Sequence, residues 1–253
     1  MTADQEAKEF DILENNPEVM NALGEKLGLS KKLAFYDVLS LDEPELLAHI
    51  PRPAYALLAI IPLTKSWQRD REEEDARLGD PITYYDGGAA AAGGDRPLVW
   101  FQQTIREACG SYGFVHCAIN GEAAKFLVPG STLDKLRTAA LPLAREERAK
   151  VLYDSEEFEE AHKSVVALGD TPEPIRGSTK HAGQHFVAYV KENGHLWELE
   201  GSRGGPLDRG TLAEDEDVLS PRALELSLKR ILTLNRDDPD VRFSCTVLAP
   251  AQP

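Results

Sequence analysis

The chain has 253 residues and a formal net charge of −15, because 43 acidic residues outnumber 28 lysines and arginines. A chain of this length can enclose one large hydrophobic core, so we expect a single domain over residues 1–253. The acidic balance argues against nucleic acid and anionic membrane surfaces as partners, since both require basic patches. It favours a basic partner or a basic peptide tail.

The cysteine content and the apolar pattern bear on the cellular compartment. Cys109, Cys117 and Cys245 are too few for a disulfide framework, which favours a reducing environment. The start MTADQEAKEFD is polar rather than signal-like, and no apolar run is long enough to span a bilayer. We therefore expect a soluble protein of the cytoplasm, with the nucleus as a second location.

The first part of the chain contains signals for both helices and strands. Asn16, followed by a proline, predicts the start of a helix that ends at Gly28. Residues 33–41 suggest a short strand leading into a loop, and residues 45–49 a short turn of helix. The continuous apolar run 54–63, bounded by prolines, predicts a strand that is covered on both faces.

Two polar or glycine-rich segments follow this strand. The charge run QRDREEEDAR, residues 68–77, is predicted to be a solvated helix face. The glycine-rich segment 84–96 is predicted to be a mobile surface loop.

The stretch from Leu98 to Asn120 carries the first candidate catalytic residues. Its start, residues 98–101, is predicted as a strand, and the helix that follows carries Cys109. A thiol in the first turns of a helix lies near the positive end of the helix dipole, which stabilises the nucleophilic thiolate. The amide of Gln103, six residues earlier, could donate to an oxyanion beside the sulfur. A lone cysteine is more often a half-buried core residue, so this signal needs support.

Residues 185–201, HFVAYVKENGHLWELEG, supply that support, because they predict a β-hairpin that turns at its Asn-Gly pair. A two-residue loop sets Val187 opposite Glu200, which makes His185 and Glu200 diagonal neighbours. A four-residue loop sets His185 directly opposite Glu200. Both registers leave imidazole and carboxylate on one face within reach of each other. A cysteine, a histidine and an acid form the nucleophile, base and orienting group of cysteine hydrolases.

The remaining segments complete an alternation of helices and strands. A Ser131–Asp134 capping box predicts a helix, and segments 146–153 and 156–168 predict two more. We expect loops at 170–184 and 201–210, because both are rich in glycine and proline. A last helix is predicted from Ser220 through Leu232, and a last strand over residues 241–248. This order of elements predicts an α+β fold.

Other titratable residues are weaker candidates. His116 shares the helix face of Cys109, but two turns separate them by about 10 Å along the axis, too far to share a proton. Cys117 and Cys245 are expected to be small core residues. Glu198 has the strand parity of Glu200 but lies nearer the turn, and Asp208 is a fallback acid in a loop.

A metal site is not predicted. His181 and His185 have the spacing of metal ligands, but Gly183 and the strand that follows argue against a helical zinc motif. No further cluster of cysteine and histidine completes a site, so we expect neither a metal nor a cofactor.

The run QTIREACGSYGFVH, residues 103–116, resembles the signature of the ubiquitin C-terminal hydrolase family, in which a glutamine lies six residues before the cysteine. The hairpin resembles the family's histidine-to-acid segment. Further matches, in chain order, are LENNPEVMNALGEKLGL, PRPAYALLAIIPLT, STLDKLR and DDPDVRFSCTVL. The resemblance covers nearly the whole chain. One departure is that the family carries an aspartate where this chain has Glu200, whose arm is one methylene longer.

The resemblance implies a papain-like α+β fold: a central, mostly antiparallel sheet with helices on both sides, in a knotted chain. It also implies a monomeric, thiol-dependent deubiquitinating hydrolase that cleaves small or flexible adducts from the C-terminal glycine of ubiquitin. Cys109 would be the nucleophile, His185 the base, Glu200 its orienting acid and Gln103 an oxyanion donor. The loop 170–184 would cross the narrow substrate slot and restrict the leaving group.

The resemblance further implies ubiquitin contacts at residues that would otherwise be read as ordinary surface, with Phe243 equally readable as core. The candidates are Leu13, Glu14, Asn16, Asp37, Arg242 and Phe243.

Two alternatives remain at this point. The first is an inactive ubiquitin-binding module of the same fold, in which Glu200 is the disabling change. The intact Gln103, Cys109 and His185 argue against it. The second is a hydrolase of a ubiquitin-like protein, and the sequence leaves it open.

Overall fold

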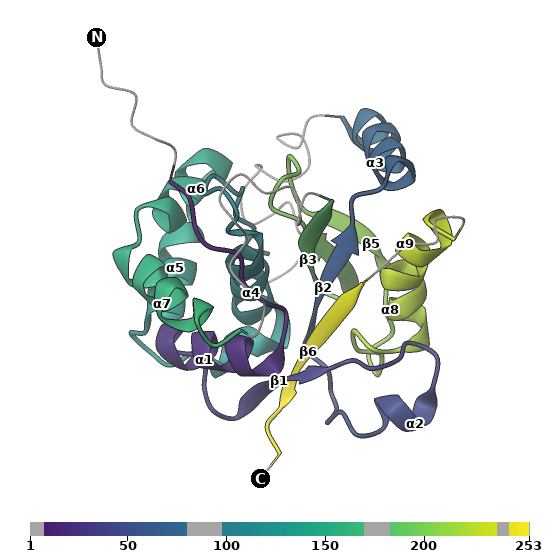
Figure 1. Cartoon of the computed structure of the whole chain (residues 1–253), viewed down its shortest axis with the longest axis horizontal. Coiled ribbons are helices and arrows are strands. Elements are labelled where there is room, and N and C mark those ends of the chain that lie inside the picture. The colour runs from purple at the N-terminus through teal and green to yellow at the C-terminus, as the bar shows by residue number, and fades with distance from the viewer. Residues whose placement is uncertain (1–7, 80–97, 170–182, 237–242, 253) are drawn as a thin grey trace.

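The computed structural model describes residues 8–79, 98–169, 183–236 and 243–252 (Figure 1). Within these ranges the α-helices are α1 (Pro17–Leu27), α2 (Pro44–Leu47), α3 (Lys65–Leu78), α4 (Cys109–Ile119), α5 (Thr132–Ala140), α6 (Arg145–Tyr153), α7 (Glu156–Val166), α8 (Pro221–Leu226) and α9 (Leu228–Leu234). A 3₁₀ helix, η2 (Gly121–Phe126), follows α4. The strands are β1 (Leu33–Asp37), β2 (Ala56–Pro62), β3 (Gln184–Glu192), β4 (His195–Leu199), β5 (Leu207–Thr211) and β6 (Ser244–Pro250).

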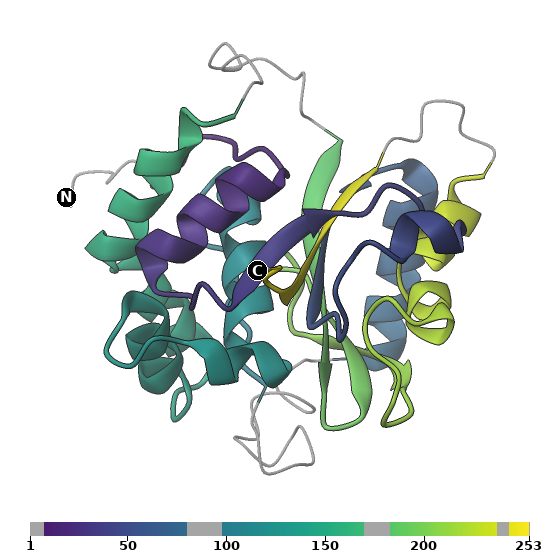
Figure 2. The same ribbon diagram turned by 90° about the horizontal axis from the view of Figure 1, so that it is seen from below.

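The strands form one sheet in the order β1-β6-β2-β3-β4-β5, and every neighbouring pair is antiparallel. Helices cover both faces of this sheet (Figure 2). One hydrophobic core lies between the sheet and α1 with α4 to α7, and a second lies on the face covered by α2, α3, α8 and α9. The predicted α+β class, with an antiparallel sheet between two helical layers, is therefore confirmed.

The central strand β2 shows why the apolar run 54–63 has no polar face. Leu58 belongs to the core on the α4 side, whereas its neighbours Leu57 and Ala59 belong to the core on the α3 side. Successive side chains of a strand point to opposite faces, so a strand between two cores must be apolar at every position. The prediction of a strand covered on both faces is confirmed.

Local signals also placed several helix starts correctly. The side chain of Asn16 caps α1 by accepting the Val19 N–H at 2.9 Å. Ser131 caps α5 by accepting the Asp134 N–H at 3.4 Å. The predicted segment 84–96 lies outside the described residues, as do residues 170–182 of the loop predicted before β3.

The predicted strand at residues 98–101 is wrong. These residues are buried, but their backbone groups bond to side chains rather than to a neighbouring strand. The Val99 N–H donates to Oδ1 of Asn120 at 2.7 Å, and the Phe101 N–H donates to Nε2 of His116 at 2.9 Å. The segment is therefore fastened to α4, the helix that begins at Cys109.

Two predictions at the C-terminal end need correction. The helix expected from Ser220 through Leu232 is two helices, α8 and α9, because the backbone leaves helical geometry at Ser227 (φ −112°, ψ −105°). The connection expected at residues 201–210 contains the start of the edge strand β5. Among the described residues, no helix combines the length and the apolar character needed to cross a membrane.

Candidate active site

Cys109 is the first residue of α4, a helix that is buried along almost its whole length. Glycines allow this helix to lie close to the sheet. A Cβ at Gly110 would lie 3.1 Å from Cβ of Leu13 and 3.2 Å from the Phe186 ring, and a Cβ at Gly113 would lie 2.6 Å from Leu58. Side chains at these positions would push the Cys109 end of the helix away from β2 and β3.

His185 and Glu200 are brought together by the register of the β3–β4 hairpin. Ala188 pairs with Leu199 and the strands are joined by two residues, as in the shorter of the two predicted loops. The turn residues have φ values of 53° and 76°, which the Asn-Gly pair tolerates well. The diagonal relation allows these two side chains to meet, and Nε2 of His185 lies 2.5 Å from Oε1 of Glu200.

The electrostatics of this pair favour an ion pair. Burial lowers the pKa of His185, but hydrogen bonds with Cys109 and Glu200 and the negative charge of Glu200 outweigh burial and raise this pKa to about 10. Burial raises the pKa of the Glu200 carboxyl, yet the hydrogen bond and attraction to His185, with help from Arg71 and Ser202, lower it to about 2. At neutral pH the imidazole is therefore protonated and the carboxylate ionised.

The thiol of Cys109 completes this chain of contacts. It is partly exposed and free of any disulfide, and its hydrogen bond to His185 is one of the contacts that raise the pKa of that histidine. Because Nε2 of the imidazole faces Glu200, Nδ1 is the nitrogen left for the sulfur. A thiol, an imidazolium and a carboxylate in series are the parts of a cysteine nucleophile with its acid–base group.

Gln103 lies beside the end of the hairpin. Its backbone N–H donates to the carbonyl of Gly201 at 2.8 Å, and a Cβ at Gly201 would lie 2.9 Å from Cβ of Gln103. Its side-chain Nε2 donates to the carbonyl of Ile105 at 3.0 Å. A primary amide carries two N–H groups, so one contact of this kind orients the amide and leaves a second donor.

His116 is placed where it cannot act as a base. It is fully buried, and burial lowers its pKa to about 3. Its Nε2 accepts the Phe101 N–H, which requires the neutral ring. His116 instead fastens the segment that leads to Gln103 onto the helix that begins at Cys109.

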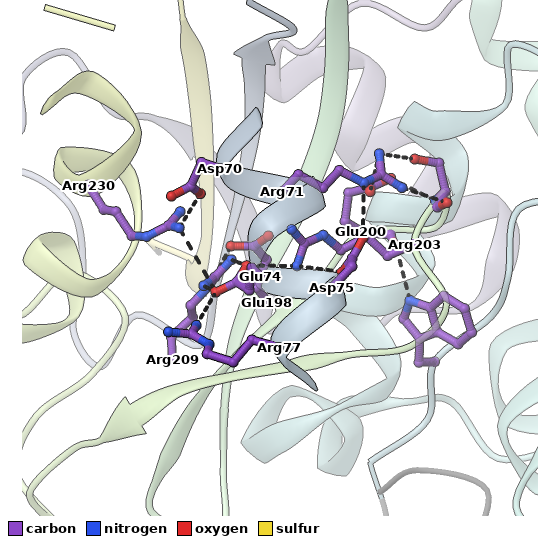
Figure 3. Close-up of polar contacts among 12 residues, drawn as sticks. Asp70, Arg71, Glu74, Asp75, Arg77, Glu198, Glu200, Arg203, Arg209 and Arg230 are labelled. Atoms are coloured by element: carbon purple, nitrogen blue, oxygen red, sulfur yellow. Dashed lines mark hydrogen bonds and ion pairs between the residues drawn. The ribbon is translucent and has the colours of Figure 1, made fainter. Parts of the chain in front are cut away.

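The charge run 68–77 was predicted to be a solvated helix face, and this is wrong for one side of α3. Trp67 and Glu74 are buried, and Arg71 between them reaches toward Glu200 (Figure 3). The three residues are spaced i, i+4, i+7 and so share a helix face. That spacing is visible in the sequence. However, two of the three residues are charged, as are most of their neighbours, so the pattern does not resemble the apolar face of an amphipathic helix.

Comparison with known proteins decides the family. The sequence profile described as ubiquitin carboxyl-terminal hydrolase, family 1, matches residues 10–232. The chain belongs to this family. It is 33% identical to ubiquitin carboxyl-terminal hydrolase isozyme L1 of Rattus norvegicus over 241 residues, which cover 94% of this chain and 97% of the relative. It is 32% identical to ubiquitin carboxyl-terminal hydrolase 3 of Arabidopsis thaliana over 225 residues, or 87% and 89% of the two chains.

Solved structures agree with this assignment at the level of the fold. The Trichinella spiralis UCH37 catalytic domain, bound to ubiquitin vinyl methyl ester, matches with a TM-score of 0.67 at 21% sequence identity and covers 96% of both chains. A second crystal structure of Trichinella spiralis UCH37 with the same ligand matches with a TM-score of 0.66 and covers 96% of this chain and 83% of that one.

The residues of this ubiquitin carboxyl-terminal hydrolase that were expected to touch ubiquitin lie in varied surroundings. Leu13 is only 3% exposed and packs against Gly110, so its side chain belongs to the core. Asn16 is occupied as the cap of α1. Asp37 ends β1 on the surface, where partial burial raises its pKa.

Two further candidates lie near other elements, and one lies beyond the described residues. Glu14 lies close to Gly169, just after α7, and Phe243 is 40% exposed immediately before β6. Arg242 falls outside the described residues. The segment that carries Leu13, Glu14 and Asn16 lies beside the start of β6, because Asn15 bonds to the Ser244 carbonyl and to Thr246, and Thr246 pairs with Asp37. The role of these residues in binding ubiquitin stays a prediction.

Proposed function

We propose that this deubiquitinating hydrolase uses Cys109 as nucleophile, His185 as general acid and base, Glu200 as the group that orients His185, and Gln103 as an oxyanion donor. The observation that supports the assignment most strongly is the position of His185, which interacts with the candidate nucleophile and lies 2.5 Å from a buried carboxylate. That arrangement provides both the nucleophile and the proton that its leaving group needs.

The reaction begins with attack of the Cys109 thiolate on the carbonyl carbon of the C-terminal glycine of ubiquitin. The carbonyl oxygen becomes an oxyanion, which accepts hydrogen bonds from the side-chain amide of Gln103 and from the Cys109 N–H. The protonated His185 gives its Nδ1 proton to the leaving amine, the C–N bond breaks, and a thioester remains.

Hydrolysis of the thioester reverses the proton movement. His185, now neutral, accepts a proton from water as the water attacks the thioester carbonyl, and the thiolate leaves. The products are the free carboxylate of ubiquitin and an enzyme in its starting charge state. Glu200 keeps its charge throughout, holding Nε2 of His185 and stabilising the imidazolium.

The proposed substrates are small or flexible adducts of ubiquitin, and a basic tail on the substrate fits the net charge of −15 on the enzyme. The three free cysteines fit action in the reducing cytoplasm. We further propose that the enzyme acts as a monomer, since the catalytic groups named here come from one chain.

The decisive experiment is hydrolysis of a fluorogenic amide at the C-terminus of ubiquitin, run beside the same amide on ubiquitin-like proteins. We expect turnover of the ubiquitin amide and no turnover by Cys109→Ala, which should still bind ubiquitin. Binding without turnover by the parent protein would favour the inactive binding module. Faster turnover of a ubiquitin-like amide would identify a different substrate for the same chemistry.

A further inference from the structure

Helix α3 places an arginine next to the carboxylate proposed to orient His185. Nη1 of Arg71 lies 3.4 Å from Oε2 of Glu200, and the Glu200 side chain is only 1% exposed (Figure 3). Arg71 is itself 21% exposed, so it reaches inward from the surface of the helix to a buried acid.

The guanidinium of Arg71 is held in place by three groups. Its Nη1 donates to Oγ of Ser202 at 2.9 Å, and its Nη2 donates to the Ser202 carbonyl at 2.8 Å. Its Cζ lies 5.3 Å from the centre of the Trp67 ring, which is a cation–π contact. An arginine fork fixed at both nitrogens presents its charge in a defined direction.

The two oxygens of Glu200 have different surroundings. Oε1 faces His185 at 2.5 Å and accepts the Ser202 N–H at 2.6 Å. Oε2 is buried and, among the described residues, accepts no hydrogen bond, so Arg71 at 3.4 Å is the cation that faces it. The Ser202 N–H therefore anchors the oxygen that faces His185, and the Arg71 charge lies nearest the other oxygen.

We propose that Arg71 is a positioning residue for catalysis, which fixes the plane of the Glu200 carboxylate so that one oxygen faces His185 while the other faces Arg71. The proposal rests on the function assigned above to Cys109, His185 and Glu200. A glutamate has one more rotatable bond than an aspartate, and ordering such a side chain costs conformational entropy. The fixed guanidinium offsets part of that freedom.

The titratable groups around His185 and Glu200 come from several elements, and their arrangement fits a positioning role for Arg71. His185 comes from β3 and Cys109 and His116 from α4, and the negative charge of Glu200 acts on both histidines. On α3, Asp75 lies 3.7 Å from Nε of Arg71 and forms a second ion pair with it, which is weaker because the Asp75 side chain is exposed to solvent. Arg71 contributes to the lowered pKa of Glu200, as does the Ser202 side chain.

Glu74, and not Arg71, makes most of the ion pairs that attach α3 to the sheet. A substitution of Arg71 can therefore test its role in catalysis without detaching the helix. Glu74 bonds to Arg203 at 2.8 Å and to Arg209 at 2.6 Å, and Arg209 also bonds to Glu198 on β4 (Figure 3). Replacing Arg71 leaves all of these contacts in place.

The test is a double-mutant cycle on hydrolysis of the ubiquitin amide. Arg71→Gln should lower kcat about tenfold and leave KM within about a factor of two, since small errors in catalytic geometry cost rate rather than binding. In the Glu200→Gln background, the same substitution should change kcat less than about twofold, because its target is already gone. Arg71→Lys should recover more than half of the lost kcat. Arg77→Gln, a matched change on the exposed side of α3, should have no effect.

Equal losses from Arg71→Gln in both backgrounds, or no loss in either, would overturn the proposal. Ser202→Ala covers the case in which Arg71→Gln does not fold. It removes the hydroxyl that holds Arg71 and keeps the backbone N–H that binds Glu200. Ser202→Ala should lower kcat in the parent protein but not in the Glu200→Gln variant. A loss of kcat only in the Glu200→Gln variant would refute the role.

A measurement without ubiquitin separates this proposal from the assigned function. The Nε2 proton of His185, lying against a carboxylate, should give a downfield proton resonance in the free protein. Arg71→Gln should shift or broaden this resonance and Arg77→Gln should not. An unchanged resonance in Arg71→Gln would overturn the positioning role, whereas failure of the parent to cleave the ubiquitin amide would overturn only the substrate assignment.

Discussion

Glu200 is the residue at which this chain departs from the aspartate expected of its family, and its environment explains how a longer acid is accommodated. Its carboxylate lies 2.5 Å from the imidazole of His185, and a backbone N–H at Ser202 and the charge of Arg71 take up its remaining contacts. The side chain therefore has a defined position despite its additional rotatable bond.

We expect Glu200→Ala to lower kcat at least about 100-fold, because loss of the orienting acid releases the imidazole and leaves its charge uncompensated. Glu200→Asp should retain or exceed the parent turnover, since the charge and the strand face are kept. Steady-state hydrolysis of the ubiquitin amide measures both, and ubiquitin affinity should change little. A parent that is inert until Glu200 becomes aspartate would instead mark Glu200 as a disabling change.

The three cysteines should differ sharply in reactivity. Burial raises the pKa of Cys117 far above the usual range for thiols and raises that of Cys245 to about 12, so neither forms a thiolate near neutral pH. An electrophilic ubiquitin probe should therefore label Cys109, which is partly exposed and bonded to His185. Mass spectrometry after proteolysis would locate the adduct, and an adduct on either buried cysteine would contradict the mechanism.

Two buried histidines predict that the fold loses stability in mild acid. Burial lowers the pKa of His116 to about 3 and that of His162 to about 4, whereas both return to about 6.5 when the chain unfolds. Their contribution to the free energy of unfolding is therefore complete above about pH 6.5, and it declines as the pH falls toward the folded-state pKa values of about 3 and about 4. Urea unfolding at a series of pH values measures the effect, and His162→Asn should reduce the slope.

His185 acts on stability in the opposite direction. The pKa of His185 is raised to about 10 in the folded protein. Its contribution to the free energy of unfolding is therefore complete below about pH 6.5 and declines as the pH rises through 10. The same urea titration extended to alkaline pH should show a decline that His185→Asn reduces. A slope identical in parent and variant would show that His185 does not hold its proton as tightly as the geometry indicates.

At the scale of elements, prediction succeeded where the signal was local. The Asn-Gly turn and the parity of β3 and β4 were sufficient to place His185 and Glu200 on one face. It failed at residues 98–101, because the partners of their N–H groups are side chains that follow later in the chain. No periodicity distinguishes a strand from an extended segment fastened to a helix. The break at Ser227 was missed because an apolar helical pattern continues across it.

Helix α3 shows a further limit, since a run of charges gives no sign of which of them will be buried. Glu74 is buried among arginines, whose attraction overcomes the effect of burial and lowers its pKa to about 2. Glu74→Gln should therefore destabilise the protein by about 3 kcal/mol, since it removes the charge that the buried Arg203 and Arg209 share and, among the described residues, leaves them only Asp75 and Glu198. Glu73→Gln, exposed on the same helix, is the control and should change stability little. Equal urea midpoints for the two variants would show that the ion pairs of Glu74 do not stabilise the packing of α3.

At the scale of the whole molecule, a net charge of −15 should act on the rate of encounter with a basic tail. We expect association with ubiquitin to slow as salt rises while dissociation changes little, because screening weakens attraction at long range. Stopped-flow binding at several salt concentrations measures both rates. Asp37→Asn should weaken binding more than Glu73→Gln, and equal effects would make Asp37 an ordinary surface acid.

The β3–β4 hairpin also limits how its sequence can vary in length. Because successive side chains of a strand alternate between faces, one residue inserted or deleted between the turn and Glu200 would turn the carboxylate away from His185. Two residues would restore the face, and a compensating bulge could do the same. Among descendants of this chain that remain active, length changes in β4 should therefore be even in number or accompanied by a bulge. Insertions at the tip of the turn, beyond the last paired residues Glu192 and His195, should be free of this rule.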